Sequence, residues 1–342
     1  MIEGLINRYK NHRKQSFLNK FGSYKHHYAF VGVGGHSASN LYPIIDYLGV
    51  PLKYICTKGV ENANKMATKY ASTIGTNDLD LVLNDPEIAG IFLCTSPQSH
   101  FQLAQKILTA GKHLFVEKPP CFTVAELHKL ISSKKENQHV VVGLQKRYST
   151  VVAHLETLKG SIDSYSYSFK TGAYPEGDPI MDLFIHSLDL INYLFGEVVQ
   201  IQKTTSKSGE TTLINFTHAN GIVGHAELSN GHSWKSASEE FSIVTNKGVY
   251  HSKGINHLQL TRKSGTVLGV PLEKVRNKPV ITEQIFDNDG FVPLAEFNEL
   301  YTHGYYGEID AFVAACEGQK SAIKTSLEAV MGTFKLIEKL QN

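Results

Sequence analysis

The chain is poor in cysteine and tryptophan, with four and one among 342 residues, and no two cysteines form a CxxC pair. Its apolar residues, 42% of the total, can build a large core without disulfide bonds. We therefore expect Cys56, Cys94, Cys121 and Cys316 to be buried thiols in a reducing compartment. Zinc-type spacing of cysteine and histidine and a GxSxG motif are both missing, so the sequence indicates neither a metal site nor serine chemistry.

A strong charge of one sign is also missing. The formal net charge of +2 gives no argument for binding nucleic acid or membranes. No uninterrupted apolar run approaches the ~20 residues of a membrane-spanning helix. The N-terminus lacks the apolar core and cleavage site of a secretory signal. We therefore expect a cytoplasmic protein with a small-molecule substrate.

The N-terminal segment differs from the rest of the chain in charge. Residues 1–27 carry six lysines and arginines against one glutamate, a net charge of +5 that leaves −3 for the remainder. Apolar residues at positions 2, 5, 6 and 9 recur at helical spacing within residues 2–21. Because a short isolated helix is marginal in water, we expect its stripe to be covered by the adjacent domain or a second subunit. A transit peptide is the main alternative, but lysine supplies most of the charge, which favours a structural arm over residues 1–26.

Short apolar runs alternate with amphipathic helical patterns in residues 27–148. The runs predict strands at residues 28–32, 52–56, 91–95, 113–116 and 140–143. Such alternation is typical of a parallel sheet with helices on both faces. We therefore predict an α/β protein whose N-terminal domain is a doubly wound Rossmann sheet.

The pattern changes in residues 149–342. One helix is predicted at residues 179–194, and short alternating runs follow over residues 198–268. Turn signals lie at Asn220-Gly221, Asn230-Gly231 and Lys247-Gly248. These features predict a C-terminal α+β domain with a large, mostly antiparallel open sheet. We expect closing helices at residues 307–316 and 326–340, the last packing back on the Rossmann domain.

The loop after the first predicted strand reads Gly32-Val33-Gly34-Gly35-His36-Ser37. In a Rossmann turn the first glycine permits the bend, the second lets a diphosphate approach, and the third position is small for close packing. The diphosphate would rest on amides at the helix N-terminus. An ordinary glycine turn is the alternative, but the loop stands between a strand and a helix, as the motif requires.

The second predicted strand ends in Cys56-Thr57-Lys58, where NAD-binding proteins carry an acidic residue. A hydroxyl and a cation suit the 2′-phosphate of NADP(H) instead. A solvated loop lysine is the alternative. We expect NADP(H) to be preferred and NAD(H) to be possible.

Three further motifs follow in order along the chain. They are Cys94-Thr95-Ser96-Pro97-Gln98-Ser99-His100, Val116-Glu117-Lys118-Pro119-Pro120 and Asp182-Leu183-Phe184-Ile185-His186. Together with the glycine loop, this ordered set resembles the glucose–fructose oxidoreductase/inositol dehydrogenase/rhizopine-catabolism (Gfo/Idh/MocA) family over nearly all of the chain beyond residue 28.

The resemblance implies a nicotinamide-dependent oxidoreductase acting on a secondary alcohol or ketone of a sugar, polyol or nucleotide sugar. It implies a homodimer or homotetramer formed through the C-terminal sheet. It adds to the cofactor site the residues Thr95, Ser96, Pro97, Gln98, His100, Glu117 and Lys118. It places at the substrate Gln145, Arg147, Asp182 and His186. The ring of Tyr148 is a further substrate candidate because it can stack on a sugar face, with core or interface packing as the alternative.

Elementary chemistry is compatible with catalytic roles for three of these residues. Histidine titrates near neutral pH, so His186 suits a general base in oxidation and a general acid in reduction. Lys118 would stabilise negative charge on the substrate oxygen. Asp182, one helical turn before His186, would orient the imidazole or hold a neighbouring hydroxyl. The alternatives are a solvated lysine and a helix-surface pair, but prolines fix the backbone after Lys118 and an apolar sequence surrounds the pair.

Two other functions remain open. Some proteins of this fold sense ligands without turnover, although the three catalytic candidates argue against such a regulator. A glycosidase that uses bound NAD for transient oxidation is the other alternative.

Overall fold

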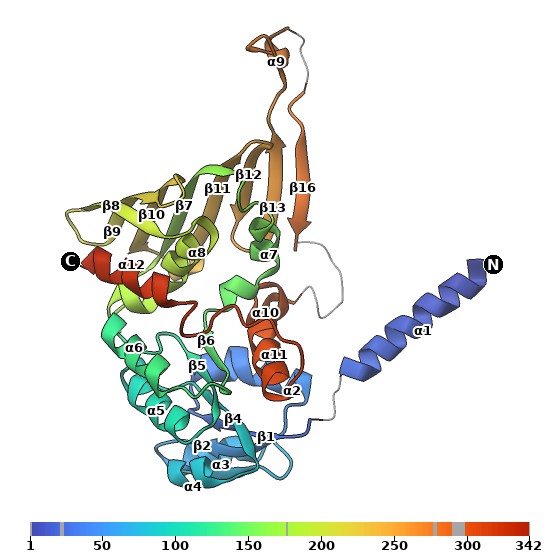
Figure 1. The fold of residues 1–342 in the computed structure, drawn as a ribbon, viewed down its shortest axis with the longest axis vertical. Coiled ribbons are helices and arrows are strands. Elements are labelled where there is room, and N and C mark those ends of the chain that lie inside the picture. Colours follow the sequence, from blue (N-terminus) through green and yellow to red (C-terminus); the bar gives the residue numbers. More distant parts are fainter. Residues whose placement is uncertain (1, 21–23, 176, 276–278, 289–297, 342) are drawn as a thin grey trace. The chain divides into compact units, whose positions relative to one another are not determined.

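The computed structural model describes residues 2–20, 24–175, 177–275, 279–288 and 298–341, with backbone only for 16–20 (Figure 1). It comprises two compact units. Unit 1 contains residues 1–120, 129–143 and 308–323. Unit 2 contains residues 121–128, 144–307 and 324–342.

The sheet of unit 1 has six parallel strands in the order β3-β2-β1-β4-β5-β6. Their bounds are β1 (His27–Val31), β2 (Leu52–Cys56), β3 (Ile74–Thr76), β4 (Ile88–Leu93), β5 (His113–Glu117) and β6 (Val140–Gly143). The order reverses between β1 and β4, which places the ligand crevice of a doubly wound sheet beyond their carboxyl ends. The predicted Rossmann architecture is confirmed.

Helices connect these strands. They are α2 (Tyr42–Leu48), α3 (Val60–Ala67), α4 (Leu79–Asn84), α5 (Pro97–Thr109) and α6 (Val124–Ser133). A π-helical turn, Ser37–Leu41, runs into α2. Such turns are frequent at functional sites.

A late segment completes the core of unit 1. Phe312 of α11 (Tyr305–Cys316) packs its ring against Phe92 and Phe115, with centroids 5.1 and 6.1 Å apart. The last helix, α12 (Met331–Gln341), contacts α8 (Ile185–Phe195) within unit 2. Its packing on the Rossmann domain stays a prediction.

The boundary predicted after residue 148 also shifts. Strand β6 ends at Gly143, and the next turn (Gln145–Tyr148) belongs to unit 2 because Arg147 is bound to residues of that unit. Unit 1 is therefore assembled from three separate stretches of chain.

The large sheet of unit 2 has eight strands in the order β16-β13-β12-β11-β7-β10-β9-β8. Only β7 and β10 pair in parallel among the described strands of this sheet. The bounds are β7 (Ile162–Gly172), β8 (Val198–Thr205), β9 (Thr211–His218), β10 (Val223–His232), β11 (Ser238–Thr245), β12 (Gly248–Lys253), β13 (His257–Arg262) and β16 (Thr282–Asp287). The predicted mostly antiparallel sheet is confirmed.

Shorter elements complete unit 2. The helices are α7 (Thr150–Glu156), α9 (Leu272–Val275) and α10 (Glu299–Thr302), and β14 (Thr266–Val267) pairs with β15 (Val270–Pro271). Helix α8 supplies the core contact of the sheet, since Phe195 stacks on Tyr165 with centroids 3.7 Å apart. Much of residues 271–303, which the sequence left unassigned, is irregular or outside the described residues.

Two local predictions were wrong. The single helix expected over residues 179–194 is a π-helical turn, Pro179–Leu183, followed by α8. Asn230-Gly231 lies inside β10, where the pairing with β7 is irregular between Ser229 and His232, so it is a strand irregularity and not a turn. Asn220-Gly221 and Lys247-Gly248 do connect strands.

The N-terminal segment forms helix α1 (Ile2–Lys20), and its predicted last residue, Phe21, lies outside the described residues. The side chains of Ile2, Leu5, Ile6 and Tyr9 are between 45% and 74% exposed. Of the helices in the described ranges, none is long and apolar enough to cross a membrane.

Candidate functional site

The glycine loop is shaped as a Rossmann turn requires. Gly32 has a φ of +108°, and a Cβ there would lie 1.9 Å from the carbonyl oxygen of Cys94, so only glycine fits. A Cβ on Gly34 or Gly35 would meet nothing within 4 Å, which leaves both backbones open to a ligand. Ser37 is fully buried, and its hydroxyl accepts a hydrogen bond from Gly34 N over 2.9 Å. Its small side chain therefore holds the loop in place.

A cavity of about 750 Å³ opens onto this loop within unit 1. The predicted cofactor residues that line it are Gly32, Gly34, Gly35, His36, Ser37, Thr57, Lys58, Thr95 and Ser96. Its position beyond β1 and β4 and its open glycine backbones fit a dinucleotide. Sequence reasoning did not assign the other ten lining residues to the cofactor site: Val31, Val33, Cys56, Gly59, Asn62, Asn77, Leu79, Cys94, Ser99 and Leu103. Asn77 follows β3, a strand of three residues that is too short for a hydrophobic pattern.

The end of β2 borders the same cavity. Lys58 is exposed, and the hydroxyl of Thr57 donates to the carbonyl of Gly59 over 2.6 Å. The described lining contains no carboxylate. The cavity wall at the end of β2 therefore carries a positive charge from Lys58.

His100 has a structural role instead of the predicted cofactor contact. It is 1% exposed, and its Nδ1 donates to the carbonyl of Pro119 over 2.8 Å. Its Nε2 accepts from the backbone N–H of Thr95 over 3.3 Å. Burial lowers the pKa of His100, in keeping with a neutral ring that ties together the loops after β4 and β5. Pro97 and the exposed Gln98 begin α5 and do not line the cavity as described.

Glu117 organises the end of β5. Its carboxylate accepts from the backbone N–H of Lys118 over 3.1 Å and lies 3.2 Å from Nε2 of His36. The amide of Asn40 donates to Nδ1 of His36, so Nε2 carries the proton directed at Glu117. Burial lowers the pKa of His36, but the hydrogen bond and charge of Glu117 outweigh it and raise the pKa above its ordinary value.

Gly143 makes room for this carboxylate. It pairs with Glu117 across β5 and β6, and a Cβ at Gly143 would lie 2.8 Å from the carboxyl carbon of Glu117. Any larger residue there would displace the group that holds the backbone of Lys118.

In unit 2, Asp182 and His186 occupy consecutive turns, Asp182 in the π-helical turn and His186 in α8. Asp182 is 5% exposed and His186 is half-buried. A Cβ at Gly177 would lie 2.0 Å from Oδ2 of Asp182, so glycine permits the preceding loop to close over the carboxylate.

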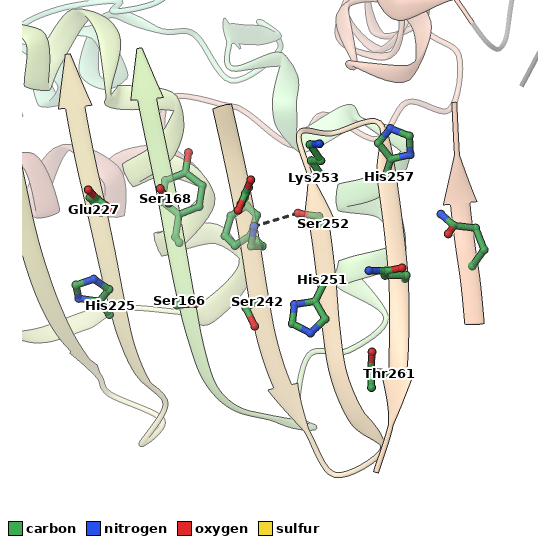
Figure 2. Close-up of a pocket in the computed structure, with 15 residues that line it drawn as sticks. Ser166, Ser168, His225, Glu227, Ser242, His251, Ser252, Lys253, His257 and Thr261 are labelled. Atoms are coloured by element: carbon green, nitrogen blue, oxygen red, sulfur yellow. Dashed lines mark hydrogen bonds between the residues drawn. The ribbon is translucent and has the colours of Figure 1, made fainter. Parts of the chain in front are cut away.

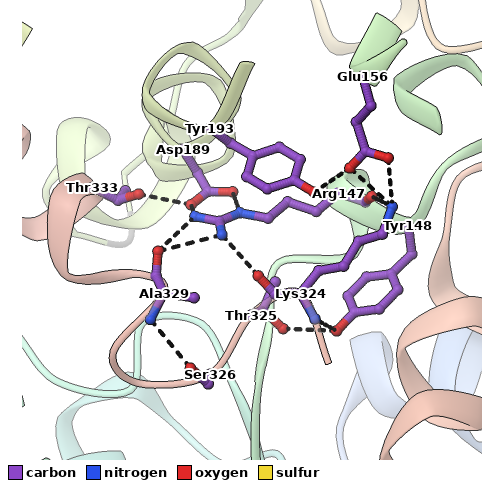
Figure 3. A network of polar contacts seen from close by, with 10 residues as sticks. All are labelled: Arg147, Tyr148, Glu156, Asp189, Tyr193, Lys324, Thr325, Ser326, Ala329 and Thr333. Carbon is purple, nitrogen blue, oxygen red and sulfur yellow. Dashed lines mark hydrogen bonds and ion pairs between the residues drawn. The ribbon is translucent and has the colours of Figure 1, made fainter. Parts of the chain in front are cut away.

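Arg147, expected at the substrate, belongs to a buried structural network (Figure 3). It is 1% exposed, and its guanidinium donates to the carboxylate of Asp189 and to the carbonyls of Lys324 and Ala329. These bonds occupy the whole donor set, so the substrate-binding assignment of Arg147 is wrong.

Its neighbours Gln145 and Tyr148 are also engaged in packing. Gln145 is 8% exposed, and its backbone carbonyl lies against Gly304. The hydroxyl of Tyr148 accepts from the backbone N–H of Lys324 over 2.8 Å. Substrate contacts for these two residues remain predictions.

A second, shallow cavity of about 840 Å³ lies on the polar face of the eight-stranded sheet (Figure 2). Small side chains on β7 and β11, Ser166, Ser168 and Ser242, form its floor. Histidines and charged residues border it, including His225, Glu227, His251 and Lys253.

Comparison with known proteins gives two family matches. The model described as "Oxidoreductase family, NAD-binding Rossmann fold" matches residues 26–144. The model described as "Oxidoreductase family, C-terminal alpha/beta domain" matches residues 133–342. Both belong to the Gfo/Idh/MocA family.

Curated relatives match over part of their length. The oxidoreductase YhhX of Escherichia coli is 26% identical over 225 residues, 60% of this chain and 65% of that protein. Inositol 2-dehydrogenase of Salmonella typhimurium is 24% identical over 180 residues, 49% of this chain and 54% of that enzyme. The chain thus spans less than two thirds of either relative.

Solved structures match over nearly the whole chain. A levoglucosan dehydrogenase in complex with NADH and levoglucosan has a TM-score of 0.74 at 18% identity, covering 92% of this chain and 95% of that one. UDP-N-acetylglucosamine 3-dehydrogenase of Acidithiobacillus ferrooxidans has a TM-score of 0.72 at 20% identity, with coverage of 92% and 95%. At these identities the likeness establishes the fold. With both family models matched in order over residues 26–342, the chain belongs to the Gfo/Idh/MocA oxidoreductase family.

Proposed function

We propose that the protein is an NAD(P)-dependent dehydrogenase or reductase that acts on a secondary alcohol or ketone of a sugar, polyol or nucleotide sugar. The open glycine loop after β1, at the reversal point of the Rossmann sheet, carries this proposal. Lys118 supports it, because it follows β5, which pairs with β4 at the same carboxyl edge of the parallel sheet. Relatives named inositol 2-dehydrogenase and levoglucosan dehydrogenase support the substrate class.

The bound dinucleotide would supply hydride-transfer chemistry through its nicotinamide. The glycine loop and the amides at the start of the following helix would hold its diphosphate. Lys118 would donate a hydrogen bond to the substrate oxygen and stabilise its developing negative charge. His186 would take the hydroxyl proton during oxidation and return it during reduction. Asp182 would orient the imidazole or hold an adjacent substrate hydroxyl.

The enzyme would prefer NADP(H) over NAD(H). The argument is the charge at the end of β2, where Lys58 and Thr57 line the cavity and its described lining has no carboxylate. A 2′-phosphate gains a charge-assisted hydrogen bond from a lysine there, whereas a ribose 2′-hydroxyl lacks its usual acidic acceptor.

A panel of sugars, polyols and nucleotide sugars with NAD(P) and NAD(P)H, followed by nicotinamide absorbance, tests the activity. Turnover with at least one secondary alcohol or ketone is expected. Binding of dinucleotide and sugar without absorbance change across the panel would favour a regulator. Glycoside cleavage with retained cofactor and no net reduction would indicate the glycosidase alternative.

We further propose a homodimer or homotetramer that buries the polar face of the large sheet. The serine-floored cavity in Figure 2 can receive side chains of a second copy, and both charge signs border it. Ser166→Arg should lower the mass measured by light scattering. An unchanged mass would show that the oligomer does not form through this face of the sheet.

A reducing compartment such as the cytoplasm fits the cysteines. All four are free thiols, and Cys56, Cys121 and Cys316 are buried while Cys94 is half-buried.

A further inference from the structure

A second carboxyl group is buried in unit 1 near the end of β5. Glu308 lies in the first turn of α11 and is fully buried. Neither of its carboxyl oxygens has a hydrogen-bond partner among the described residues. An ionised carboxylate without hydrogen bonds or a cation is costly in such a place. The neutral acid is therefore the favoured form of Glu308.

The charged group that acts on Glu308 is Glu117. This glutamate is 5% exposed and receives the hydrogen bonds of Lys118 N and His36 described above. Donors of this kind stabilise a carboxylate, so Glu117 is the ionised member. Burial, and then the charge of Glu117, raise the pKa of Glu308 well above its usual range. Burial, and then the charge of Glu117, also raise the pKa of the Cys94 thiol, which follows β4.

We propose that Glu117 and Glu308 share one proton, which resides on Glu308 at neutral pH and keeps the charge behind Lys118 at a single carboxylate. Two neighbouring carboxyl groups in a dry site commonly retain one proton between them. Glu308 is thus a positioning residue that acts through Glu117. Its effect on turnover rests on the proposed function, whereas its protonation does not.

Infrared difference spectra of the intact protein test the protonation directly. At neutral pH, subtracting the spectrum of Glu308→Gln from that of the wild type should reveal the carbonyl band of one protonated carboxylic acid. Glu317 is the matched control, because it is 9% exposed and accepts from Tyr28 OH and Lys25 N over 2.9 and 2.8 Å. Glu317→Gln should remove no such band. Absence of the band for Glu308 would overturn the proposal.

Thermal unfolding against pH gives a second measurement. A carboxyl whose folded pKa is raised contributes stability that is present at low pH and lost as pH rises through that pKa. The melting temperature of the wild type should therefore fall relative to that of Glu308→Gln as the pH rises above about 4.3, where the unfolded glutamate ionises, and level off above the folded pKa. Parallel curves would contradict the protonated state.

Glu117→Gln tests whether the proton is shared. Removing the neighbouring charge should shift the loss of the infrared band to lower pH. An unmoved midpoint would show that burial alone holds the proton and would overturn the pairing.

The pH profile of turnover tests the link to activity. The kcat of the wild type should fall at alkaline pH as a second charge forms, and Glu308→Gln should lack this fall. The same alkaline fall in both proteins would overturn the link to Lys118. If no substrate is turned over while the infrared band is present, the proposed function fails and the shared proton stands.

Discussion

Arg147 donates two parallel hydrogen bonds to Asp189, from Nε to Oδ2 over 2.8 Å and from Nη2 to Oδ1 over 2.6 Å. Both side chains are buried, and Thr333 of α12 donates a third hydrogen bond to Asp189 over 2.7 Å. Arg147→Met would leave the Asp189 carboxylate buried without its cation. Loss of one partner of a buried pair costs about 3–5 kcal/mol. Urea unfolding should show a loss of this size.

Arg262→Met is the control. Arg262 makes the same two-point contact with Glu283, over 2.6 and 3.0 Å, but the side chains are 49% and 42% exposed. Exposed ion pairs contribute little to stability because solvent screens them, so Arg262→Met should cost much less than Arg147→Met. Equal losses in the two variants would show that burial does not set the strength of the Arg147 contact.

Lys118→Met and His186→Ala should each lower turnover by roughly 10²–10⁴-fold, the usual contribution of acid–base assistance. Dinucleotide affinity should be nearly unchanged, because the glycine loop and β2 supply most of that binding. The measurements are steady-state kinetics and calorimetric titration. Lys106→Met and His128→Ala, two exposed positions, are the controls. Near wild-type turnover in either test variant would remove that residue from the mechanism.

Lys58→Asp should erase or reverse the preference for NADPH, since it places a negative charge against the 2′-phosphate. A lost charge-assisted hydrogen bond corresponds to at least about tenfold in affinity. Lys65→Asp on α3 makes the same charge change at another exposed position and should leave the preference intact. Calorimetry that shows tighter NADH binding by the unmodified protein would refute the assignment.

The environment of His113 should make the free energy of unfolding fall at acidic pH. Its Nδ1 accepts from the backbone N–H of His139, and the two rings stack with centroids 5.0 Å apart. Burial, and then the charges of His139 and His26, lower the pKa of His113 to about 4. The stability this neutral ring provides is therefore present above about pH 6.5 and lost as pH falls toward 4.

His113→Asn should flatten that part of the pH dependence. The difference from the wild type should reach on the order of 2 kcal/mol, after allowance for partial exposure. Urea midpoints at several pH values measure it. The exposed His128→Asn is the control, and an equal slope in both variants would contradict the assignment.

Deleting residues 1–20 tests the N-terminal arm and retains the next contacts. Tyr24 OH donates to the carbonyl of Leu48 over 2.7 Å, and Lys25 N donates to Glu317. If the exposed apolar stripe of α1 packs in an assembly, the deletion should lower the melting temperature or the oligomer mass. If neither changes, the arm has no part in fold or assembly.

The sequence predicts five of the six described Rossmann strands because each contains a continuous apolar run, and β2 and β6 begin and end where expected. Strand β3 was missed, since its three residues are too few for a hydrophobic pattern. It predicts the glycine loop because backbone sterics demand glycine at Gly32. The sequence does not predict the structural role of Arg147, because the partner of Arg147, Asp189, is 42 residues away and no local pattern links the two residues. Glu308 was missed for the same reason. A glutamate near the start of a helix gives no sign of burial until the chain is folded.

Helix α11 has a consequence for biosynthesis. The aromatic core around Phe92 and Phe115 is closed by Phe312, which is translated after nearly the whole of unit 2. The nascent Rossmann sheet therefore leaves the ribosome with part of its apolar surface uncovered. This surface is covered only after α11 has been translated. Chains that stop before α11 therefore expose it to chaperones and proteases.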